Sequence, residues 1–292
     1  MIIINLTGGI GNQMFQYAFG HILSKKSGVP LKYHFTDALF CTSRNYSLDC
    51  FSISTSKASR EEVRKTGFPQ SFLGRIMYRI FKRTGISGIV YPRIITMENY
   101  LKKAGEIEPG NDYYAEGYWQ GTKYLDGFED KIINIFTFKD TPSNNNVNLL
   151  DLIRRTNSVS IHIRRGDYIT NQGVRRMFDL CGKDYYKRCI DYIYKHIPSP
   201  RFFIFTDDIA WAKDNIHTKT SAHFVENNKA WEDMYLMSKC SHNIISNSTF
   251  GWWGAFLNKN KKKIVVAPNR WSAKDDPGIT NMIPQQWITI AN

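Results

Sequence analysis

The feature that most constrains the fold is a short strand pattern that runs directly into charged residues and a glycine. Apolar and polar residues alternate in the order Val159, Ser160, Ile161, His162, Ile163, Arg164. This alternation predicts a β-strand with one apolar face. Gly166 and Asp167 follow and end the strand. His162 and Arg164 therefore share the polar face at the C-terminal end of a strand, where open α/β sheets bind their ligands.

Two adjacent arginines at this strand end indicate an anion site. A guanidinium holds a phosphate through two parallel hydrogen bonds and stays charged at any working pH. Arg164 lies on the polar face, whereas Arg165 points the other way or lies in the following loop. A structural ion pair between Arg165 and Asp167 is the alternative, and the short motif alone leaves both interpretations open.

Composition agrees with an anionic partner. The 292 residues include 39 Lys or Arg and 26 Asp or Glu, a net charge of +13, which favours a nucleotide, a nucleic acid or a membrane surface as partner. The five cysteines form no close pair and no metal-ligand spacing, which favours a reducing compartment. We expect a cytoplasmic protein, because the sequence has neither a signal-peptide pattern nor an apolar run long enough to span a bilayer.

A second ligand-binding pattern lies at the start of the chain. Residues 1–6 read as a buried strand, residues 8–13 as a glycine-rich turn and residues 14–25 as a helix. A strand, a glycine-rich turn and a helix together can cradle a phosphate, because the helix N-terminus offers N–H groups. The turn matches neither a Walker loop nor GxGxxG. Gly9, Gly11, Asn12 and Gln13 are candidate ligand groups, and a tight turn that needs positive φ is the structural alternative.

Two further strand ends carry polar groups. Residues 201–206 read as a buried strand followed by Asp207 and Asp208, whose carboxylates can accept hydrogen bonds from a guanine edge or a ribose. Either acid can instead cap the helix expected from Ala210. Residues 246–249 place hydroxyls and an amide at a helix N-terminus, a second anion site, with Ser248 as a plain N-cap as the alternative.

The middle of the chain is harder to interpret. Residues 72–83 form an amphipathic helix pattern with basic residues opposite the apolar ones, which either lies on an anionic membrane or, as is commoner, packs its apolar face on the domain. Residues 113–119 are strand-like and aromatic, which suits either a sugar-stacking surface or a core, and Glu116 is a conceivable general base. The polar stretch 141–146 reads as a linker, so we place a domain boundary between residues 145 and 146.

Four segments together resemble the bacterial α-1,2-fucosyltransferases of glycosyltransferase family 11. They are residues 8–16, 162–168, 205–208 and 246–253. The resemblance implies an α/β fold of the GT-B type, with two Rossmann-like domains facing a cleft. It makes residues 1–145 the N-terminal, acceptor-side domain and residues 146–292 the C-terminal, GDP-fucose-binding domain. It also implies inversion at the anomeric carbon, no cofactor and no required metal.

The resemblance implies a role for each site residue. Arg164 is the catalytic residue that holds the β-phosphate of the donor, and Asp208 reads guanine. The other donor-binding residues are His162, Arg165 and Asp167 from the strand motif, Ser246, Asn247, Ser248 and Thr249 from the later loop, and Gly9, Gly11, Asn12 and Gln13 from the first turn. No family motif fixes the base, so Glu116 stays a candidate on chemistry alone.

The expected reaction moves L-fucose from GDP-β-L-fucose to the 2-OH of a terminal galactose in an oligosaccharide, a surface glycan or a lipid-linked glycan. Peripheral contact with the inner membrane is compatible with that acceptor. One alternative is a GT-B transferase that uses another sugar nucleotide. The other is a basic, non-enzymatic nucleic-acid-binding protein, against which the sequence shows no nucleic-acid-binding motif.

Overall fold

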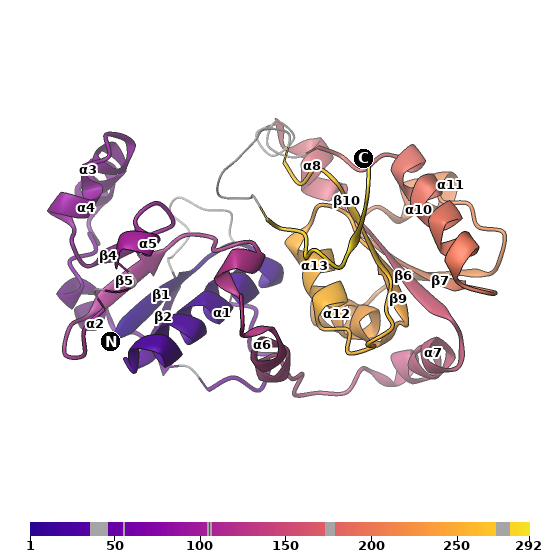
Figure 1. The fold of residues 1–292 in the computed structure, drawn as a ribbon, viewed down its shortest axis with the longest axis horizontal. Helices are drawn as coiled ribbons and strands as arrows, with labels where there is room; N and C mark the ends of the chain where they lie inside the picture. Colours follow the sequence, from indigo (N-terminus) through magenta and orange to yellow (C-terminus); the bar gives the residue numbers. More distant parts are fainter. Residues whose placement is uncertain (36–45, 55, 104, 106, 173–178, 273–280) are drawn as a thin grey trace. The chain divides into compact units, whose positions relative to one another are not determined.

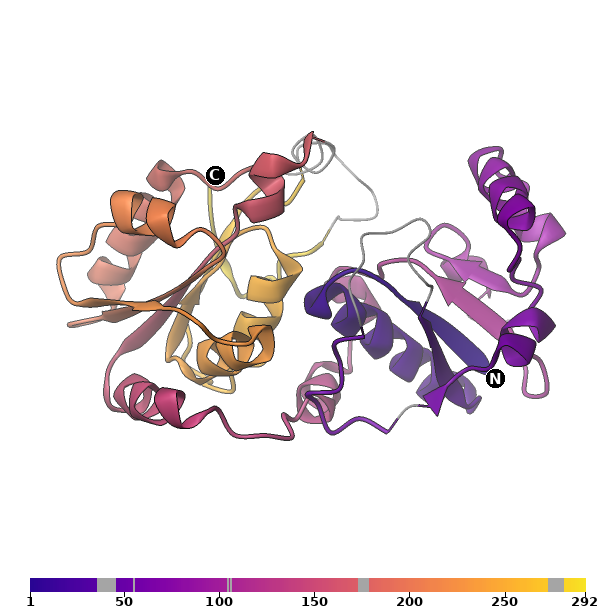
Figure 2. The ribbon, with the colours of Figure 1, turned by 180° about the vertical axis from the view of Figure 1, so that it is seen from behind.

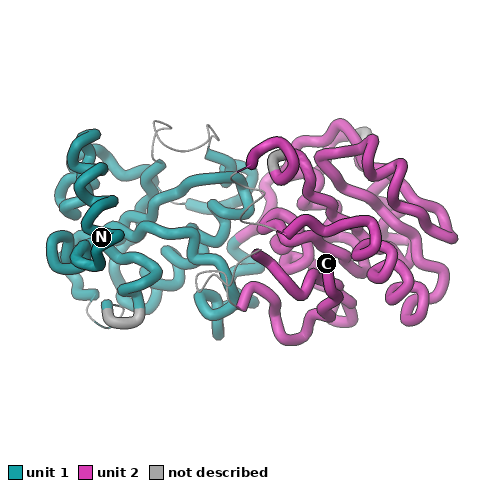
Figure 3. Tube along the Cα trace, turned by 90° about the horizontal axis from the view of Figure 1, so that it is seen from above, with its two compact units in different colours: residues 1–135 teal, residues 136–292 magenta. Residues whose placement is uncertain are grey.

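The computed structural model describes residues 1–35, 46–54, 56–103, 105, 107–172, 179–272 and 281–292. The chain divides into two compact units, unit 1 with residues 1–135 and unit 2 with residues 136–292 (Figure 3). Each unit is described by itself. No helix within the described ranges is long and apolar enough to cross a membrane.

Unit 1 contains, in its described part, a five-stranded sheet in the order β3-β2-β1-β5-β4, and every described pairing is parallel (Figure 1). The strands are β1 (Ile2–Leu6), β2 (Leu31–Phe35), β3 (Ser56–Lys57), β4 (Ile94–Thr96) and β5 (Tyr113–Glu116). The helices are α1 (Ile10–Ser27), α2 (Arg60–Lys65), α3 (Phe72–Arg83), α4 (Ser87–Val90), α5 (Tyr100–Lys103), η2 (Thr122–Tyr124) and α6 (Glu129–Ile135). The sheet is therefore parallel, as expected for the Rossmann-like domain that the family resemblance implied.

The central strand of unit 1 explains this arrangement. All five residues of β1 are buried, as expected for a strand covered on both faces. The helix α1 follows β1 after one turn and packs on it, and it ends where Gly28 adopts a left-handed φ of 69°. Because β1 pairs in parallel with β2 and β5, the C-terminal ends of these three strands lie at one edge of the sheet.

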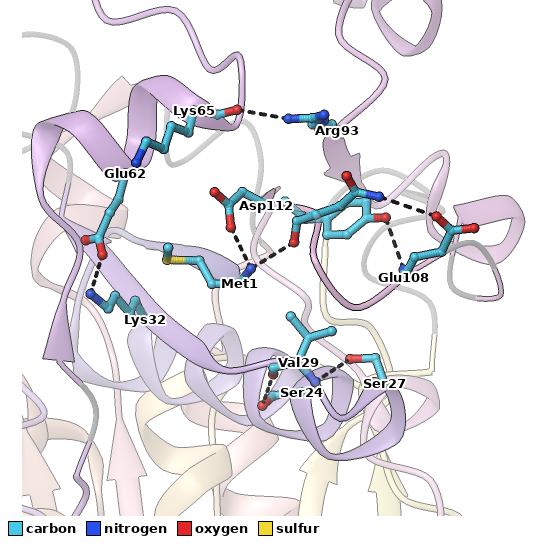
Figure 4. A network of polar contacts seen from close by, with 12 residues as sticks. Met1, Ser24, Ser27, Val29, Lys32, Glu62, Lys65, Arg93, Glu108 and Asp112 are labelled. Carbon is cyan, nitrogen blue, oxygen red and sulfur yellow. Dashed lines mark hydrogen bonds and ion pairs between the residues drawn. The ribbon is translucent and has the colours of Figure 1, made fainter.

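Polar contacts bind the N-terminal ends of the unit 1 strands to neighbouring segments (Figure 4). The amino group of Met1 donates to the carboxylate of Asp112 at 2.6 Å and to the carbonyl of Asn111 at 2.8 Å. Lys32 at the start of β2 forms an ion pair with Glu62 of α2 (Figure 4). These contacts satisfy the N-terminal ends of the strands with groups of unit 1 itself.

Unit 2 contains a six-stranded sheet in the order β11-β10-β9-β6-β7-β8, again with every described pairing parallel. The strands are β6 (Ser158–Ile163), β7 (Arg201–Thr206), β8 (Ala222–Val225), β9 (His242–Ile244), β10 (Val265–Pro268) and β11 (Ile288–Ile290). The helices are α7 (Asn144–Arg155), α8 (Gly166–Thr170), α10 (Lys183–His196), α11 (Ile209–Asn215), α12 (Ala230–Lys239) and α13 (Thr249–Phe256).

Helices cover both faces of the unit 2 sheet, with α10 and α11 on one side and α12 and α13 on the other (Figures 1 and 2). The apolar residues of β6 pack against Tyr186, Ile190 and Ile193 of α10. The polar residues of β6 face the other layer, where Ser160 accepts a hydrogen bond from Asn243 of β9 at 2.7 Å. The predicted alternation of β6 is confirmed, and both faces of the strand are buried.

The polar stretch 141–146 is not a linker throughout, because α7 begins at Asn144. The backbone N–H of Ser143 and the side chain of Asn146 both donate to Glu232 of α12, at 2.9 and 3.3 Å. The polar residues of this stretch therefore attach the start of α7 to α12. The two compact units meet in sequence between Ile135 and Phe136.

Candidate active site

The predicted donor-binding segments of unit 2 meet at one edge of its sheet. The strand β6 lies between β9 and β7, so the residues that follow these three parallel strands are neighbours. The chain continues from β6 to β7 on one side and reaches β9 on the other, which makes the β6–β9 boundary a topological switch point. Open α/β sheets bind ligands outside the strand ends at such a point. The segments after β6, β7 and β9 therefore lie side by side, and their binding of a donor stays a prediction.

Both arginines after β6 are held by the acids after β7. Nη1 of Arg164 lies 3.0 Å from Oδ2 of Asp207, and Nε of Arg165 lies 3.1 Å from Oδ2 of Asp208. Arg165 also lies over the ring of Trp211, 3.9 Å from its centroid. The Arg164 side chain is 24% exposed and that of Arg165 is 13% exposed. Arg164 is therefore the better placed of the two to reach a ligand, whereas Arg165 is held between Asp208 and Trp211.

Arg165 pairs with Asp208, and the alternative of an Arg165–Asp167 pair stays a prediction. Asp167 lies in α8, and its side chain falls outside what the structure describes. Sequence reasoning did not identify Trp211, because its contact with Arg165 joins two segments far apart in the chain. The residues around Arg165 in the sequence carry no pattern that predicts a contact with Trp211.

The two acids after β7 have different roles in the fold. Asp208 is the N-cap of α11, and its Oδ1 accepts a hydrogen bond from the backbone N–H of Trp211 at 3.1 Å. Asp207 accepts the backbone N–H of Arg165 at 2.8 Å and pairs with Arg164. Of the two acids offered as caps, Asp208 is the one that caps the helix, because α11 begins at Ile209, one residue earlier than expected.

His162 is a buried neutral residue that holds the loop after β9. It is 5% exposed, and its Nδ1 lies 3.0 Å from the hydroxyl oxygen of Ser246. Burial, and secondly the positive charge of Arg164, lowers the pKa of His162 to about 3. An uncharged imidazole cannot neutralise a phosphate, so His162 acts here by positioning Ser246.

We predict a pH-dependent stability that arises from His162. The unfolded chain binds this proton below its ordinary pKa of 6.5, whereas the folded protein does so only below about 3. The free energy of unfolding should therefore fall as the pH is lowered through that window, by up to about 1.4 kcal/mol per pH unit. Urea denaturation of His162→Gln should show a shallower slope between these pH values. His223→Gln, at an exposed position on β8, is the control and should keep the wild-type slope.

The loop between β9 and α13 is fixed by its own side chains. Ser246 is fully buried and Asn247 is 1% exposed. The amide nitrogen of Asn247 donates to the carbonyls of Asp179 and Trp271, at 2.5 and 3.0 Å. Ser248 is the N-cap of α13, its hydroxyl accepting the N–H of Phe250 at 3.3 Å. Ser248 therefore has the capping role that was the structural alternative. The Asn247 side chain bonds to backbone carbonyls within unit 2 and so holds the loop in place.

Gly251 lets α13 approach β6 closely. A Cβ at this position would lie 2.6 Å from Nδ1 of His162, whose ring is already bonded to Ser246. We predict that Gly251→Ala lowers the free energy of unfolding by about 1–3 kcal/mol, because a buried ring must shift. Gly88→Ala is the matched control, since a Cβ there meets nothing within 4 Å. Urea denaturation with equal losses in both variants would contradict this account.

The predicted glycine-rich turn of residues 8–13 is shorter than expected, because α1 begins at Ile10 and so includes Gly11, Asn12 and Gln13. Gly8 has φ of 77°, and a Cβ on it would lie 2.6 Å from the amide nitrogen of Asn12. The side chain of Gln13 is buried, donates to the carbonyl of Gly8 at 2.9 Å and accepts the N–H of Ser47 at 2.9 Å. Asn12 accepts a hydrogen bond from Gln120 at 3.0 Å. The expected positive φ is present, at Gly8 rather than at Gly9 or Gly11.

Glu116 and the aromatic residues near it are part of the fold of unit 1. The hydroxyl of Tyr78 donates to Glu116 at 2.6 Å, and Nζ of Lys82 lies 3.9 Å from the same carboxylate oxygen. Trp119 is fully buried and stacks on Phe19 with centroids 3.7 Å apart. The sugar-stacking interpretation is therefore wrong for Trp119, which is core.

Metal ligands do not cluster in the parts of the chain that are described: no group of three or more His, Cys, Asp or Glu could hold an ion there. Metal independence remains a prediction that needs a direct test.

Comparison with known proteins assigns the chain to a family. The family model for glycosyl transferase family 11 matches residues 92–291. The chain is 34% identical over 299 residues to an α-1,2-colitosyltransferase of Escherichia coli, with 99% of each protein covered. It is 24% identical over 267 residues to the galactoside 2-α-L-fucosyltransferase SEC1 of Bos taurus, covering 87% of this chain and 63% of that protein.

One solved structure has a similar fold. A mutant of Arabidopsis thaliana FUT1 in complex with GDP aligns with a TM-score of 0.53 and 13% identity, covering 97% of this chain and 75% of that one. This likeness supports the expected fold class of two parallel α/β domains. Together with the full-length relative, the family match settles the relationship: the chain belongs to glycosyl transferase family 11.

Proposed function

We propose that this enzyme transfers L-fucose from GDP-β-L-fucose to the 2-OH of a terminal galactose, with inversion at the anomeric carbon. The observation that carries the proposal is the placement of Arg164, part-exposed and held by Asp207 at the switch point of the unit 2 sheet. The name of the Bos taurus relative supports galactose as acceptor and fucose as the transferred sugar.

In this proposal, the domain of residues 146–292 binds the donor. Arg164 binds the β-phosphate, because its guanidinium matches phosphate geometry. Asp208 accepts the N–H groups of guanine. Ser248 and Thr249 would contact the diphosphate through hydroxyls and backbone N–H groups. Ser246 and Asn247 support this loop from within, because both are buried and their side chains are bonded inside unit 2. His162 and Arg165 keep these groups in place.

The domain of residues 1–145 would bind the acceptor, and its candidate ligand groups at the start of α1 are Gly9, Gly11, Asn12 and Gln13. Gln13 supports this turn from within, because its amide is buried and already bonded. We keep Glu116 as the candidate base, because it is the carboxylate that ends β5 at the C-terminal edge of the sheet. The acceptor is a galactose-terminated oligosaccharide or lipid-linked glycan, and the enzyme would act in the cytoplasm.

A second candidate function is transfer of colitose, favoured by the name of the Escherichia coli relative. Colitose is the 3-deoxy counterpart of L-fucose, so the two donors differ by one hydroxyl. A site that hydrogen-bonds this hydroxyl discriminates strongly against the sugar that lacks it. Competition between GDP-fucose and GDP-colitose, with both products counted, decides between them: fucose should be transferred preferentially.

Nucleotide specificity tests the donor proposal without any acceptor. Binding to the folded state raises the melting temperature. We expect GDP and GDP-fucose to raise it and UDP to leave it unchanged. Stabilisation by UDP and not by GDP would favour a transferase that uses another sugar nucleotide.

We predict that turnover survives a chelator. Arg164 and the helix N-termini that follow the strands supply positive charge to the diphosphate, a task that Mg²⁺ or Mn²⁺ performs in metal-dependent transferases. The rate of GDP release should be unchanged in EDTA. Loss of activity in EDTA, with recovery on adding either ion, would show that the site needs a metal.

A further inference from the structure

Helices α3 and α4 present an unusual apolar surface. Eight of the twelve large hydrophobic side chains exposed in the described residues lie between positions 72 and 90. We define them as the α3–α4 patch: Phe72, Leu73, Ile76, Met77, Ile80, Ile86, Ile89 and Val90. Leu73 is 74% exposed and Ile89 82%. The two helices contact each other and stand out beyond β4 and β5 (Figures 1 and 2).

The helix α3 is attached to the sheet by the side opposite its apolar stripe. Tyr78 is the only buried residue of α3, which is described throughout its length. Its ring contacts Phe68 and Tyr91 edge-on, and its hydroxyl donates to Glu116 of β5 at 2.6 Å. At 3.6 residues per turn, Tyr78 points away from the stripe formed by Leu73, Ile76 and Ile80. The expectation that α3 packs its apolar face on the domain is therefore wrong.

The charged residues of the segment that carries the patch have one sign. Residues 71–93 contain five Lys or Arg and no Asp or Glu. Arg79 and Arg83 lie beside the apolar stripe of α3, and both are exposed. Long basic side chains at the rim of an apolar surface can place their charged ends among anionic headgroups while the apolar residues enter the acyl boundary.

We propose that the α3–α4 patch docks on the surface of an anionic lipid bilayer. Charge complementarity selects this occupant, because each Lys or Arg near an anionic membrane contributes attraction that a neutral surface does not. A second copy of the chain is disfavoured, since a symmetric dimer would bring the same basic rims together. The proposal is independent of which sugar nucleotide the enzyme uses.

Vesicle sedimentation tests the docking directly. The full-length protein should sediment with vesicles of phosphatidylcholine and phosphatidylglycerol and only weakly with phosphatidylcholine alone. Leu73→Asp and Ile89→Asp should each weaken binding to the anionic vesicles about tenfold or more, because an exposed apolar residue no longer enters the bilayer. Arg83→Glu should weaken binding to anionic vesicles and leave the weak binding to neutral ones unchanged.

The matched control is Val147→Asp on α7, which replaces an apolar residue that is 53% exposed in unit 2. It should bind vesicles like the wild type. Transfer to a soluble acceptor should be unchanged in all these variants, so that failure of docking is separable from failure of the donor proposal. Equal binding by Leu73→Asp and the wild type, equal binding to both vesicle types, or lipid-free self-association lost in Leu73→Asp would each overturn the proposal.

Discussion

Arg164→Ala is expected to lower kcat for fucosyl transfer about 10²–10³-fold, the typical cost of removing one preorganised charge donor from a transition state. Negative charge builds on the β-phosphate as the bond to fucose breaks. A guanidinium fixed beside it stabilises the transition state more than the bound substrate. Asp207 provides that fixation, 3.0 Å from Nη1 of Arg164.

Two variants sharpen the Arg164 experiment. Arg164→Lys should not restore turnover, because an ammonium lacks the bidentate geometry of the guanidinium. Arg155→Ala is the matched control, since Arg155 is also paired with a carboxylate, that of Asp151, but lies on the exposed side of α7. It should turn over at the wild-type rate. Near-normal kcat in Arg164→Ala would remove Arg164 from the catalytic role.

Asp208→Asn is expected to raise KM for GDP-fucose about 5- to 150-fold with kcat little changed. Guanine presents N–H donors that require an acceptor, and an amide turned toward them leaves polar groups unpaired. The contact is the same in the ground and transition states, so KM changes and kcat does not. The asparagine still caps α11, because Asn and Asp are comparable N-caps.

Comparison of variants separates the cap of α11 from guanine binding. Asp208→Ala should raise KM and also lower the free energy of unfolding by about 1 kcal/mol through loss of the cap. Ser59→Ala removes the N-cap of α2 and should lower stability similarly while KM stays unchanged. An unchanged KM in Asp208→Asn would remove Asp208 from guanine binding.

The local sequence pattern was sufficient to predict the strands that carry the site. The alternation of β6 has a period of two residues, the apolar run of β7 is continuous, and the structure confirms both strands. Where a helix starts was predicted less well. Asp207 and Asp208 are both good caps, and the choice between them depends on the residue at which the chain leaves β7.

Long-range contacts explain the remaining differences. Asn247 bonds to Asp179 and Trp271, and Gln13 bonds to Ser47, so amides that looked available to a ligand are engaged within the fold. Such partners lie far away in the sequence and leave no periodic signal. The orientation of α3 likewise depends on the contacts of Tyr78 with Phe68, Tyr91 and Glu116, which the helical pattern does not specify.

The most direct test of the proposed reaction is product analysis. Purified enzyme is incubated with GDP-fucose and a galactose-terminated disaccharide, and the linkage in the product is assigned by nuclear magnetic resonance. We predict one new α-anomeric fucose attached to O2 of galactose, with release of GDP. A fucose on another hydroxyl, or transfer that occurs only from a UDP-sugar, would contradict the account.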